Sequence, residues 1–319
     1  CIISSTRADF GILSNLINIL QKQNFLKTSL IVTGTHLEEK YGFTYKEISK
    51  KKIEIYKKIK VSPNKNDQIN LLKNSSIIIK KFSKELKTLS PDLILLLGDR
   101  YETFCIAYCA FILGIPIAHF YGGEVTKNSL DDSLRHSITK LSNFHFVSTN
   151  NYYKRVVQLG ERKKNVFNIG SLSLDKINKI KFLSKKQIQK KLKINFNKNV
   201  ILCTIHSETN NLSQIQKQIT ICLKALKEIK YSTIIFTMPN NDLGSDFIIK
   251  KISNFCRVKK NAYLFKSLGR DVYFSCIKLA SLVIGNSSSG IIETPTLGTP
   301  SINLGDRQRG RVKATCVHD

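Results

Sequence analysis

The sequence lacks the features that mark several large classes of protein. It has no tryptophan, one methionine and six prolines in 319 residues, and no run of about 20 apolar residues that could span a bilayer. Neither of two common phosphate-binding glycine motifs, GxxxxGK(S/T) and GxGxxG, occurs. The eight cysteines form no CxxC pair and have no metal-like spacing with histidine. We therefore expect buried thiols in a reducing cytoplasm, with neither a metal nor a cofactor.

Acidic residues are also scarce, with 23 Asp and Glu against 51 Lys and Arg and a formal charge of +28. Such a basic chain is a candidate for binding nucleic acid. Most of the basic residues, however, are lysines dispersed among asparagine and isoleucine, and they do not gather in one stripe. We predict a solvated basic surface that attracts an anionic nucleotide substrate, with no nucleic-acid partner and no membrane partner.

Apolar runs alternate with helical segments along the whole chain. Runs such as Leu93–Leu97 are continuously apolar, which is typical of buried parallel strands. The pattern stops at a lysine-rich stretch and then restarts at Val200–Ile205. This predicts an α/β fold with two Rossmann-like doubly wound domains facing a cleft. The expected parts are a first domain over 1–170, a crossover linker over 171–196 and a second domain over 197–319.

The length of 319 residues suits two domains. The chain begins at Cys1, already inside an apolar run, and stops at Asp319 soon after Val317 without a closing helix. We therefore expect a fragment that is trimmed at both ends, more heavily at the C-terminus, with an incomplete second domain.

Ionisable residues follow two predicted strands, at the edge where open parallel sheets bind ligands. Asp99 ends a buried strand, so it should be partly desolvated and suited to act as a general base. The residues after the next strand are His119, Glu124, Asp131, Asp132, Arg135 and His136. Asp131 and Arg135 are four apart on a predicted helix, and the alternative interpretation is a simple surface ion pair.

Three more polar residues stand at predicted strand ends. Arg7 lies between the first strand and the first helix, and we expect it to face the cleft. His36 follows the second strand, and His206 ends the first strand of the second domain, from where it would point across the cleft. A lone histidine is more often structural than catalytic, and we assign His145 to the core but His206 and His136 to the site.

A serine-rich segment, 286–290, precedes a predicted helix over Ser289–Leu297. Free backbone N–H groups at a helix start bind phosphate, and the helix dipole assists. Glu293, one turn on, could accept both hydroxyls of a ribose. The alternative is a serine N-cap with a capping-box glutamate. Three arginines within 307–311 follow the next strand and favour a nucleotide site, because arginine suits forked recognition of phosphate.

Seven motifs in this order carry a family resemblance: STRADFG from Ser5, VTGTH from Val32, GDRYE from Gly98, GGE from Gly122, DDSLRH from Asp131, NSSSGIIE from Asn286 and NLGDRQ from Asn303. Together they resemble the hydrolysing UDP-N-acetylglucosamine 2-epimerases of sialic and legionaminic acid biosynthesis over nearly the whole chain. The resemblance implies a glycosyltransferase-B-type fold that lacks a C-terminal segment here. It also implies a cytoplasmic, metal-free enzyme for a UDP-sugar that forms a homodimer or homotetramer.

The resemblance implies elimination followed by hydration, from UDP-N-acetylglucosamine through 2-acetamidoglucal to free N-acetylmannosamine and UDP. The residues that it implies for catalysis are Asp99, Glu124, Asp131 and His206. Those that it implies for substrate binding are Arg7, His36, Arg135, His136, Ser288, Ser289, Glu293 and Arg307. Tyr121 departs from the pattern, because part of the family carries a catalytic glutamate there. The general acid is therefore left open between Glu124 and another residue.

Four alternatives remain at this point. The substrate could be a UDP- or GDP-linked 2,4-diacetamido-trideoxy sugar of the legionaminic acid route. A retaining glycosyltransferase would transfer the sugar with carbon 2 unchanged. A catalytically silent nucleotide-sugar-binding protein would need cations for the diphosphate but not clustered carboxylates. A nucleic-acid-binding protein would show steeply salt-dependent binding to DNA.

Overall fold

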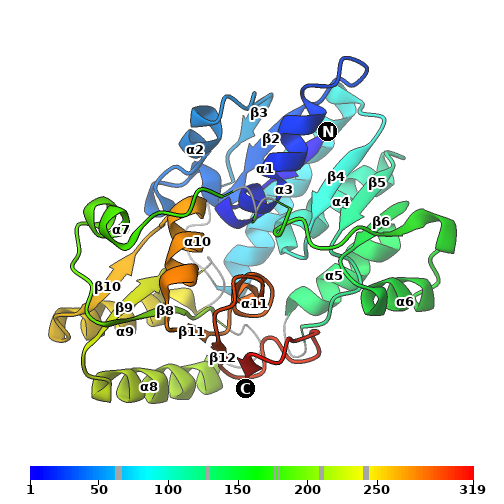
Figure 1. The fold of residues 1–319 in the computed structure, drawn as a ribbon. Coiled ribbons are helices and arrows are strands. Elements are labelled where there is room, and N and C mark those ends of the chain that lie inside the picture. The colour runs from blue at the N-terminus through cyan, green and yellow to red at the C-terminus, as the bar shows by residue number, and fades with distance from the viewer. Residues whose placement is uncertain (62–66, 127–129, 176, 178–179, 208–211, 240–243) are drawn as a thin grey trace. The chain divides into compact units, whose positions relative to one another are not determined.

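The computed structural model describes residues 1–61, 67–126, 130–175, 177, 180–207, 212–239 and 244–319 (Figure 1). The chain divides into two compact units. Unit 1 contains Cys1–Glu124 and Leu130–Asp175, and unit 2 contains Lys176–Asp319 and Val125–Ser129. Within the described residues, no helix is both long enough and apolar enough to cross a membrane.

Unit 1 is built on a seven-stranded parallel sheet with the order β3-β2-β1-β4-β5-β6-β7. Its strands are β1 Ile2–Ser4, β2 Leu30–Thr33, β3 Lys57–Ile59, β4 Ile94–Leu97, β5 Ile117–Phe120, β6 Phe144–Val147 and β7 Val166–Asn168. Its α-helices are α1 Arg7–Leu20, α2 Tyr45–Lys50, α3 Gln68–Leu89, α4 Tyr101–Ile112, α5 Leu130–Leu141 and α6 Asn150–Gln158.

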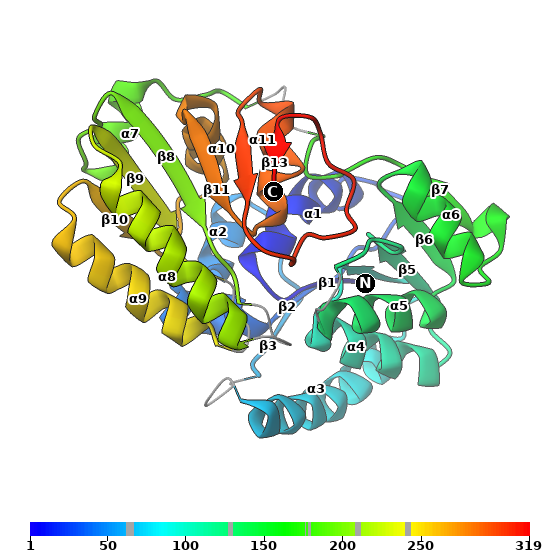
Figure 2. The ribbon, with the colours of Figure 1, turned by 90° about the horizontal axis from the view of Figure 1, so that it is seen from below.

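Helices cover both faces of this sheet, which is why its central strands are apolar on both sides. On one face, Phe10 and Leu13 of α1 and Ile48 of α2 pack against the strands. On the other, Phe82 of α3 and Ile106 of α4 pack against them, together with residues of α5. Figure 2 shows α3, α4 and α5 side by side on that second face. Burial on two faces explains the absence of a polar–apolar alternation in these strands.

Unit 2 repeats the arrangement with a six-stranded parallel sheet of order β10-β9-β8-β11-β12-β13. Its strands are β8 Asn199–Thr204, β9 Ser232–Thr237, β10 Ala262–Phe265, β11 Leu282–Gly285, β12 Ser301–Asn303 and β13 Val317–His318. Its α-helices are α7 Lys185–Leu192, α8 Leu212–Glu228, α9 Ser245–Val258, α10 Arg270–Leu279 and α11 Glu293–Thr296. The predicted α/β fold with two doubly wound units is therefore confirmed.

Three local features of the structure were not predicted from the sequence. The strand β3 has the sequence Lys-Lys-Ile and lacks the apolar run that would have identified it. The helix expected over Ser289–Leu297 is wrong, because the segment forms a 3₁₀ turn at Ser288–Gly290 and then the four-residue α11. Pro295 explains the break, since it has no N–H to donate to a preceding turn. The segment 171–196, expected to be a linker, contains α7, which packs against α10.

The strand order of each sheet reverses once, between β1 and β4 in unit 1 and between β8 and β11 in unit 2. Ligands of doubly wound sheets bind outside the carboxyl ends of the strands at such a switch point. Gly285 ends β11 with φ at 143°, and a Cβ there would lie 1.9 Å from the Thr204 carbonyl oxygen of β8. Only glycine therefore lets these two strand ends approach so closely.

Two of the buried histidines of unit 1 lie on strands of its sheet. His119 of β5 is hydrogen-bonded through Nε2 to the Gly98 carbonyl at 2.8 Å and through Nδ1 to the Thr139 hydroxyl at 3.3 Å. Burial lowers the pKa of His119 to about 4. His145 of β6 contacts Glu161 at 3.2 Å, as expected for a core histidine. Both imidazoles are therefore part of the scaffold.

The lowered pKa of His119 predicts acid sensitivity of unit 1. In the unfolded chain His119 binds a proton near pH 6.5, but in the folded chain it does so only near pH 4. The neutral His119 ring therefore contributes its full share to the stability of unit 1 above pH 6.5, and this contribution is lost as the pH falls toward 4. From pH 7 to pH 5 it should cost about 2 kcal/mol of unfolding free energy. Urea unfolding of wild type and His119→Gln at both pH values tests this. The variant should lose that part of the pH dependence, and His318→Gln, which changes an exposed histidine, should keep it. An unchanged pH dependence in His119→Gln would refute the assignment.

Candidate active site

The guanidinium of Arg135 in α5 organises the carboxyl edge of the unit 1 sheet. It is fully buried. It donates to the Asp99 carboxylate through Nη2, and through Nη1 to Asp132 Oδ1 at 3.1 Å and to the Glu124 carbonyl at 2.8 Å. Burial opposes the charged form, but the carboxylates of Asp99, Glu124 and Asp132 outweigh it and raise the pKa of Arg135. This burial excludes the interpretation of Arg135 as one half of a surface ion pair.

Asp99 itself immediately follows the β4–Gly98 strand end, beside the switch point. Its side chain keeps 23% of its surface exposed while Arg135 keeps 1%. A partly open carboxylate held by a buried cation is fixed in direction and still accessible to a small molecule. This combination suits a group that must take a proton from a bound ligand.

Asp132 connects the ion pair to a histidine on the next turn of α5. Its second oxygen lies 3.7 Å from His136 Nε2. Burial lowers the pKa of His136 more than Asp132 raises it, so the ring is neutral near pH 7. Its Nδ1 is buried and has no hydrogen-bond partner among the described residues. Asp131 lies in the first turn of the same helix and is partly exposed.

Glu124 and Tyr121 occupy the segment that follows β5. The Glu124 side chain is buried and accepts a hydrogen bond from the Ser148 hydroxyl at 3.2 Å. Tyr121 has a φ of 67°, which side-chain-bearing residues rarely adopt. Its hydroxyl lies 3.0 Å from that of Ser171 and accepts from the Ser173 N–H at 3.2 Å. These contacts tie Tyr121 to the chain after β7.

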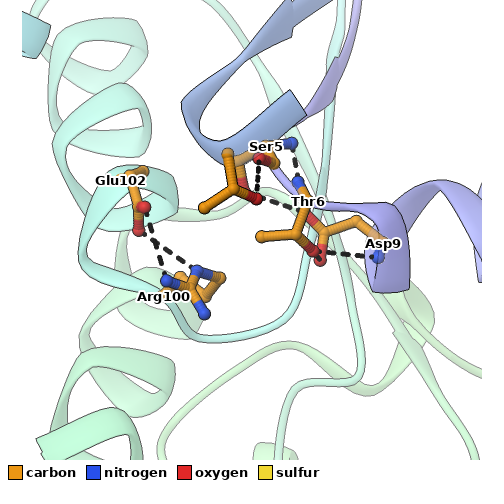
Figure 3. Close-up of polar contacts among 6 residues, drawn as sticks. Ser5, Thr6, Asp9, Arg100 and Glu102 are labelled. Carbon is orange, nitrogen blue, oxygen red and sulfur yellow. Dashed lines mark hydrogen bonds and ion pairs between the residues drawn. The ribbon is translucent and has the colours of Figure 1, made fainter. Parts of the chain in front are cut away.

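The start of α1 is fixed by a capping box that Figure 3 shows in close-up. Asp9 accepts from the backbone N–H groups of Ser5 and Thr6 at 3.1 and 2.9 Å, and its own N–H donates to the Thr6 hydroxyl at 3.2 Å. Such reciprocal bonds satisfy donors that a helix start would otherwise leave open. Arg7, the first residue of α1, is thereby held at the carboxyl end of β1.

A second ion pair lies beside this helix start. Arg100 Nε donates to the buried Glu102 carboxylate at 3.3 Å (Figure 3). Burial raises the pKa of Glu102 in spite of Arg100. Burial, followed by the nearby Glu102, also raises the pKa of Glu38 to about 7. The motif that begins at Gly98 therefore contributes two carboxylates with different partners. Asp99 is partly exposed and pairs with Arg135, whereas Glu102 is buried and pairs with Arg100.

His36, expected in the site, is fully buried in the 3₁₀ turn after β2. Its Nε2 lies 3.0 Å from the Ser4 hydroxyl and its Nδ1 lies 2.8 Å from the Thr44 hydroxyl. Burial lowers its pKa to about 4. A neutral ring with both nitrogens bonded holds the loop after β2 against β1, which favours a positioning role over contact with a ligand.

In unit 2, a buried amide joins the strand ends at the switch point. Asn286 follows β11 and is fully buried. Its Oδ1 accepts from the His206 N–H at 2.6 Å, and its Nδ2 donates to the His206 carbonyl at 2.9 Å. Its own carbonyl accepts from Arg307 Nη1 at 3.1 Å and from Gln308 Nε2 at 2.8 Å. Asn286 therefore hydrogen-bonds to both the His206 backbone and the Arg307 side chain.

The serine segment continues from Asn286 into the 3₁₀ turn. The Ser287 hydroxyl accepts from the Ser289 N–H at 3.4 Å, and the Ser289 hydroxyl accepts from Tyr273 of α10 at 2.8 Å. Ser288 and Glu293 are partly exposed. Because α11 has four residues, a helix dipole contributes little here. Any anion at this turn would therefore be held by hydroxyls, backbone N–H groups and Arg307.

The spacing of Asp132, three from Arg135 and four from His136, already placed these side chains on one helix face, and the structure shows both contacts. Sequence reasoning missed Asn286 as the residue that connects the group in unit 2. Asn286 had no such signal, because its partner His206 is 80 residues away. Of the arginines at 307–311, Arg307 contacts the strand ends, whereas Arg309 is exposed and pairs with Asp306.

The comparison with known proteins gives one consistent result. The family described as UDP-N-acetylglucosamine 2-epimerase matches residues 18–318. The GDP/UDP-N,N'-diacetylbacillosamine 2-epimerase (hydrolyzing) of Campylobacter jejuni is 43% identical over all of this chain and 83% of its own length. The UDP-N-acetylglucosamine 2-epimerase of Neisseria meningitidis is 33% identical over 97% of this chain and 80% of its own.

Solved structures show the same fold. The crystal structure of the Neisseria meningitidis UDP-GlcNAc 2-epimerase bound to UDP-GlcNAc has a TM-score of 0.81 at 21% identity, covering 97% of this chain and 83% of that one. A family match over almost the whole chain and a 43% identical relative agree with the motifs at both switch points. The chain belongs to the UDP-N-acetylglucosamine 2-epimerase family.

Proposed function

We propose that this protein is a hydrolysing 2-epimerase that releases a free 2-acetamido sugar from its nucleoside diphosphate. The observation that supports this most is the Asp99 carboxylate, held by buried Arg135 beside the β1–β4 switch point and still partly open. A rigid, accessible carboxylate can remove a weakly acidic proton from a bound sugar. Binding a nucleotide sugar without chemistry would require none of the carboxylates gathered there.

In the proposed reaction, Asp99 takes the proton from carbon 2 of the sugar. The electron pair forms a double bond between carbons 1 and 2, and the nucleoside diphosphate leaves from carbon 1. Water then adds across the double bond, with hydroxyl on carbon 1 and a proton on the opposite face of carbon 2. The product is a free sugar with inverted carbon 2.

Other residues of unit 1 take supporting roles in this proposal. Glu124 is the better candidate for the general acid, because the Tyr121 hydroxyl is already bonded to Ser171 and Ser173. Asp131 is proposed as a catalytic residue because it begins the DDSLRH motif that carries the family resemblance. The unpartnered Nδ1 of neutral His136 can hydrogen-bond the sugar.

In unit 2, the proposed nucleotide contacts are Ser288, Ser289, Glu293 and Arg307, with His206 as a further catalytic residue. Arg307 supplies the positive charge that a diphosphate requires. The buried Asn286 supports the assignment, because it holds the Arg307 side chain and the His206 backbone together.

The substrate that we favour is UDP- or GDP-linked N,N'-diacetylbacillosamine, a 2,4-diacetamido sugar. One relative named for that sugar shares 43% identity with this chain and a second shares 30%, against 33% for a relative named for UDP-N-acetylglucosamine. UDP-N-acetylglucosamine, the substrate expected from the motifs alone, is the second candidate. The carbon 2 chemistry is the same for both.

Turnover in deuterium oxide tests the proposal. The protein is incubated separately with the UDP- and GDP-linked diacetamido sugars and with UDP-N-acetylglucosamine, and the products are analysed by NMR and mass spectrometry. We expect free sugar with one deuterium at an inverted carbon 2, formed fastest from a diacetamido substrate. Release without deuterium would contradict the mechanism, and a deuterated sugar that stays on its nucleotide would contradict hydrolysis.

Replacing the proposed base tests its role. Asp99→Asn should lower kcat by about 10³-fold, the usual order for losing a general base, while nucleoside diphosphate binding measured by calorimetry stays within about twofold. The matched control is Asp92→Asn, which changes an exposed aspartate just before the same strand and should leave kcat unchanged. Near wild-type turnover of Asp99→Asn would show that another group removes the proton.

A further inference from the structure

The hydroxyl of Ser289 is oriented by a tyrosine of the neighbouring helix α10. Tyr273 donates a hydrogen bond to Ser289 Oγ at 2.8 Å. A serine hydroxyl accepts at its lone pairs and donates its single proton. Within the described residues the Ser289 proton has no acceptor, and the side chain is partly exposed. Ser289 therefore has one proton to give to a ligand, on the side that does not face Tyr273.

Two further hydroxyls fix the backbone of the same 3₁₀ turn. Thr294 of α11 donates to the Ser289 carbonyl at 2.9 Å, and Ser301 of β12 donates to the Gly290 carbonyl at 2.6 Å. Both donors are buried. A cavity of about 10 Å³ lined by Tyr273 and Gly290 has about the space that one water needs, so it cannot hold a phosphate. A phosphate at this turn therefore has to bind on the exposed side, where the Ser289 hydroxyl lies.

We propose, building on the proposed function in which Ser289 contacts the nucleotide, that Tyr273 is a positioning residue that fixes the Ser289 hydroxyl as a donor to a phosphate of the nucleoside diphosphate. A free hydroxyl rotates to suit its surroundings. Because the Tyr273 proton occupies one lone pair of Ser289 Oγ, the serine proton is kept for the ligand. Tyr273 acts through Ser289 and need not contact the nucleotide itself.

The direction of these hydrogen bonds suits an anion. An ionised phosphate oxygen only accepts, and hydrogen bonds to ionised acceptors are roughly twice as strong as neutral ones. A hydroxyl that accepts one hydrogen bond is polarised and donates the next one more strongly. A cation lies at the start of the same turn, since Arg307 Nη1 donates to the Asn286 carbonyl at 3.1 Å. A diphosphate therefore completes a chain of donors that begins at Tyr273.

Removing only the Tyr273 hydroxyl tests this role, because Tyr273→Phe keeps the aromatic ring. Binding of UDP and of GDP is measured by calorimetry, which gives both the Kd and the number of sites per chain. For the diphosphate that wild type binds more tightly, Tyr273→Phe should raise the Kd about fivefold, the usual order for one hydrogen bond, with the number of sites unchanged. A variant that is merely less well folded would show fewer sites and an unchanged Kd.

The matched control is Tyr263→Phe. Tyr263 is also half-buried, but it lies in β10, which β9 and β8 separate from β11. This variant should bind the diphosphate as wild type does. In turnover, Tyr273→Phe should raise KM by about the same factor as Kd and leave kcat within about twofold, because the hydroxyl acts on binding and not on the proton transfer.

A double-mutant cycle shows whether Tyr273 acts through Ser289. Ser289→Ala should raise the Kd at least ~10-fold, since it removes a hydrogen bond to a charged group. The double variant should bind no more weakly than Ser289→Ala alone. An unchanged Kd in Tyr273→Phe, losses that multiply in the double variant, or a wild type that binds neither diphosphate would overturn the proposal. The expected changes in Kd without release of free sugar would support the role of Tyr273 and contradict the proposed reaction instead.

Discussion

The buried Arg135 guanidinium is the constraint on which the carboxyl edge of unit 1 depends. A cation without exposed surface must be surrounded by acceptors, because losing one partner of a buried pair costs about 3–5 kcal/mol. Asp99, Asp132 and the Glu124 carbonyl supply the acceptors. They come from the end of β4, from α5 and from the chain after β5. One charge therefore fixes three segments and holds the Asp99 carboxylate at the end of β4 with part of its surface exposed.

In unit 2, a neutral side chain connects the carboxyl ends of the strands. The Asn286 amide has no net charge to compensate, and it joins the ends of β8 and β11 and the chain after β12 through direct hydrogen bonds. Gly285 makes this junction sterically possible. The charged group lies in the unit proposed to handle a proton, and the neutral one lies in the unit proposed to hold a nucleotide.

Much of this was predictable from the sequence, because buried parallel strands are apolar runs and their ends are marked by abrupt polarity. Asp99, His206 and the serine segment were predicted in that way, and each does follow a strand end, although their roles stay predictions. The strand β3 was not, since an edge strand of the sequence Lys-Lys-Ile has no apolar run. The burial of Arg135 was also not predictable, because helical spacing alone does not show which face is covered.

A double-mutant cycle on turnover tests most directly whether Arg135 acts through Asp99. The rate of carbon 2 deuteration is measured for Arg135→Lys, Asp99→Asn and the double variant. Lysine keeps the charge but loses the planar fork that holds Asp99, so each single variant should be impaired. The account predicts that the double variant is no slower than Asp99→Asn alone, since residues that act as a unit are not additive. Losses that multiply in the double variant would contradict it.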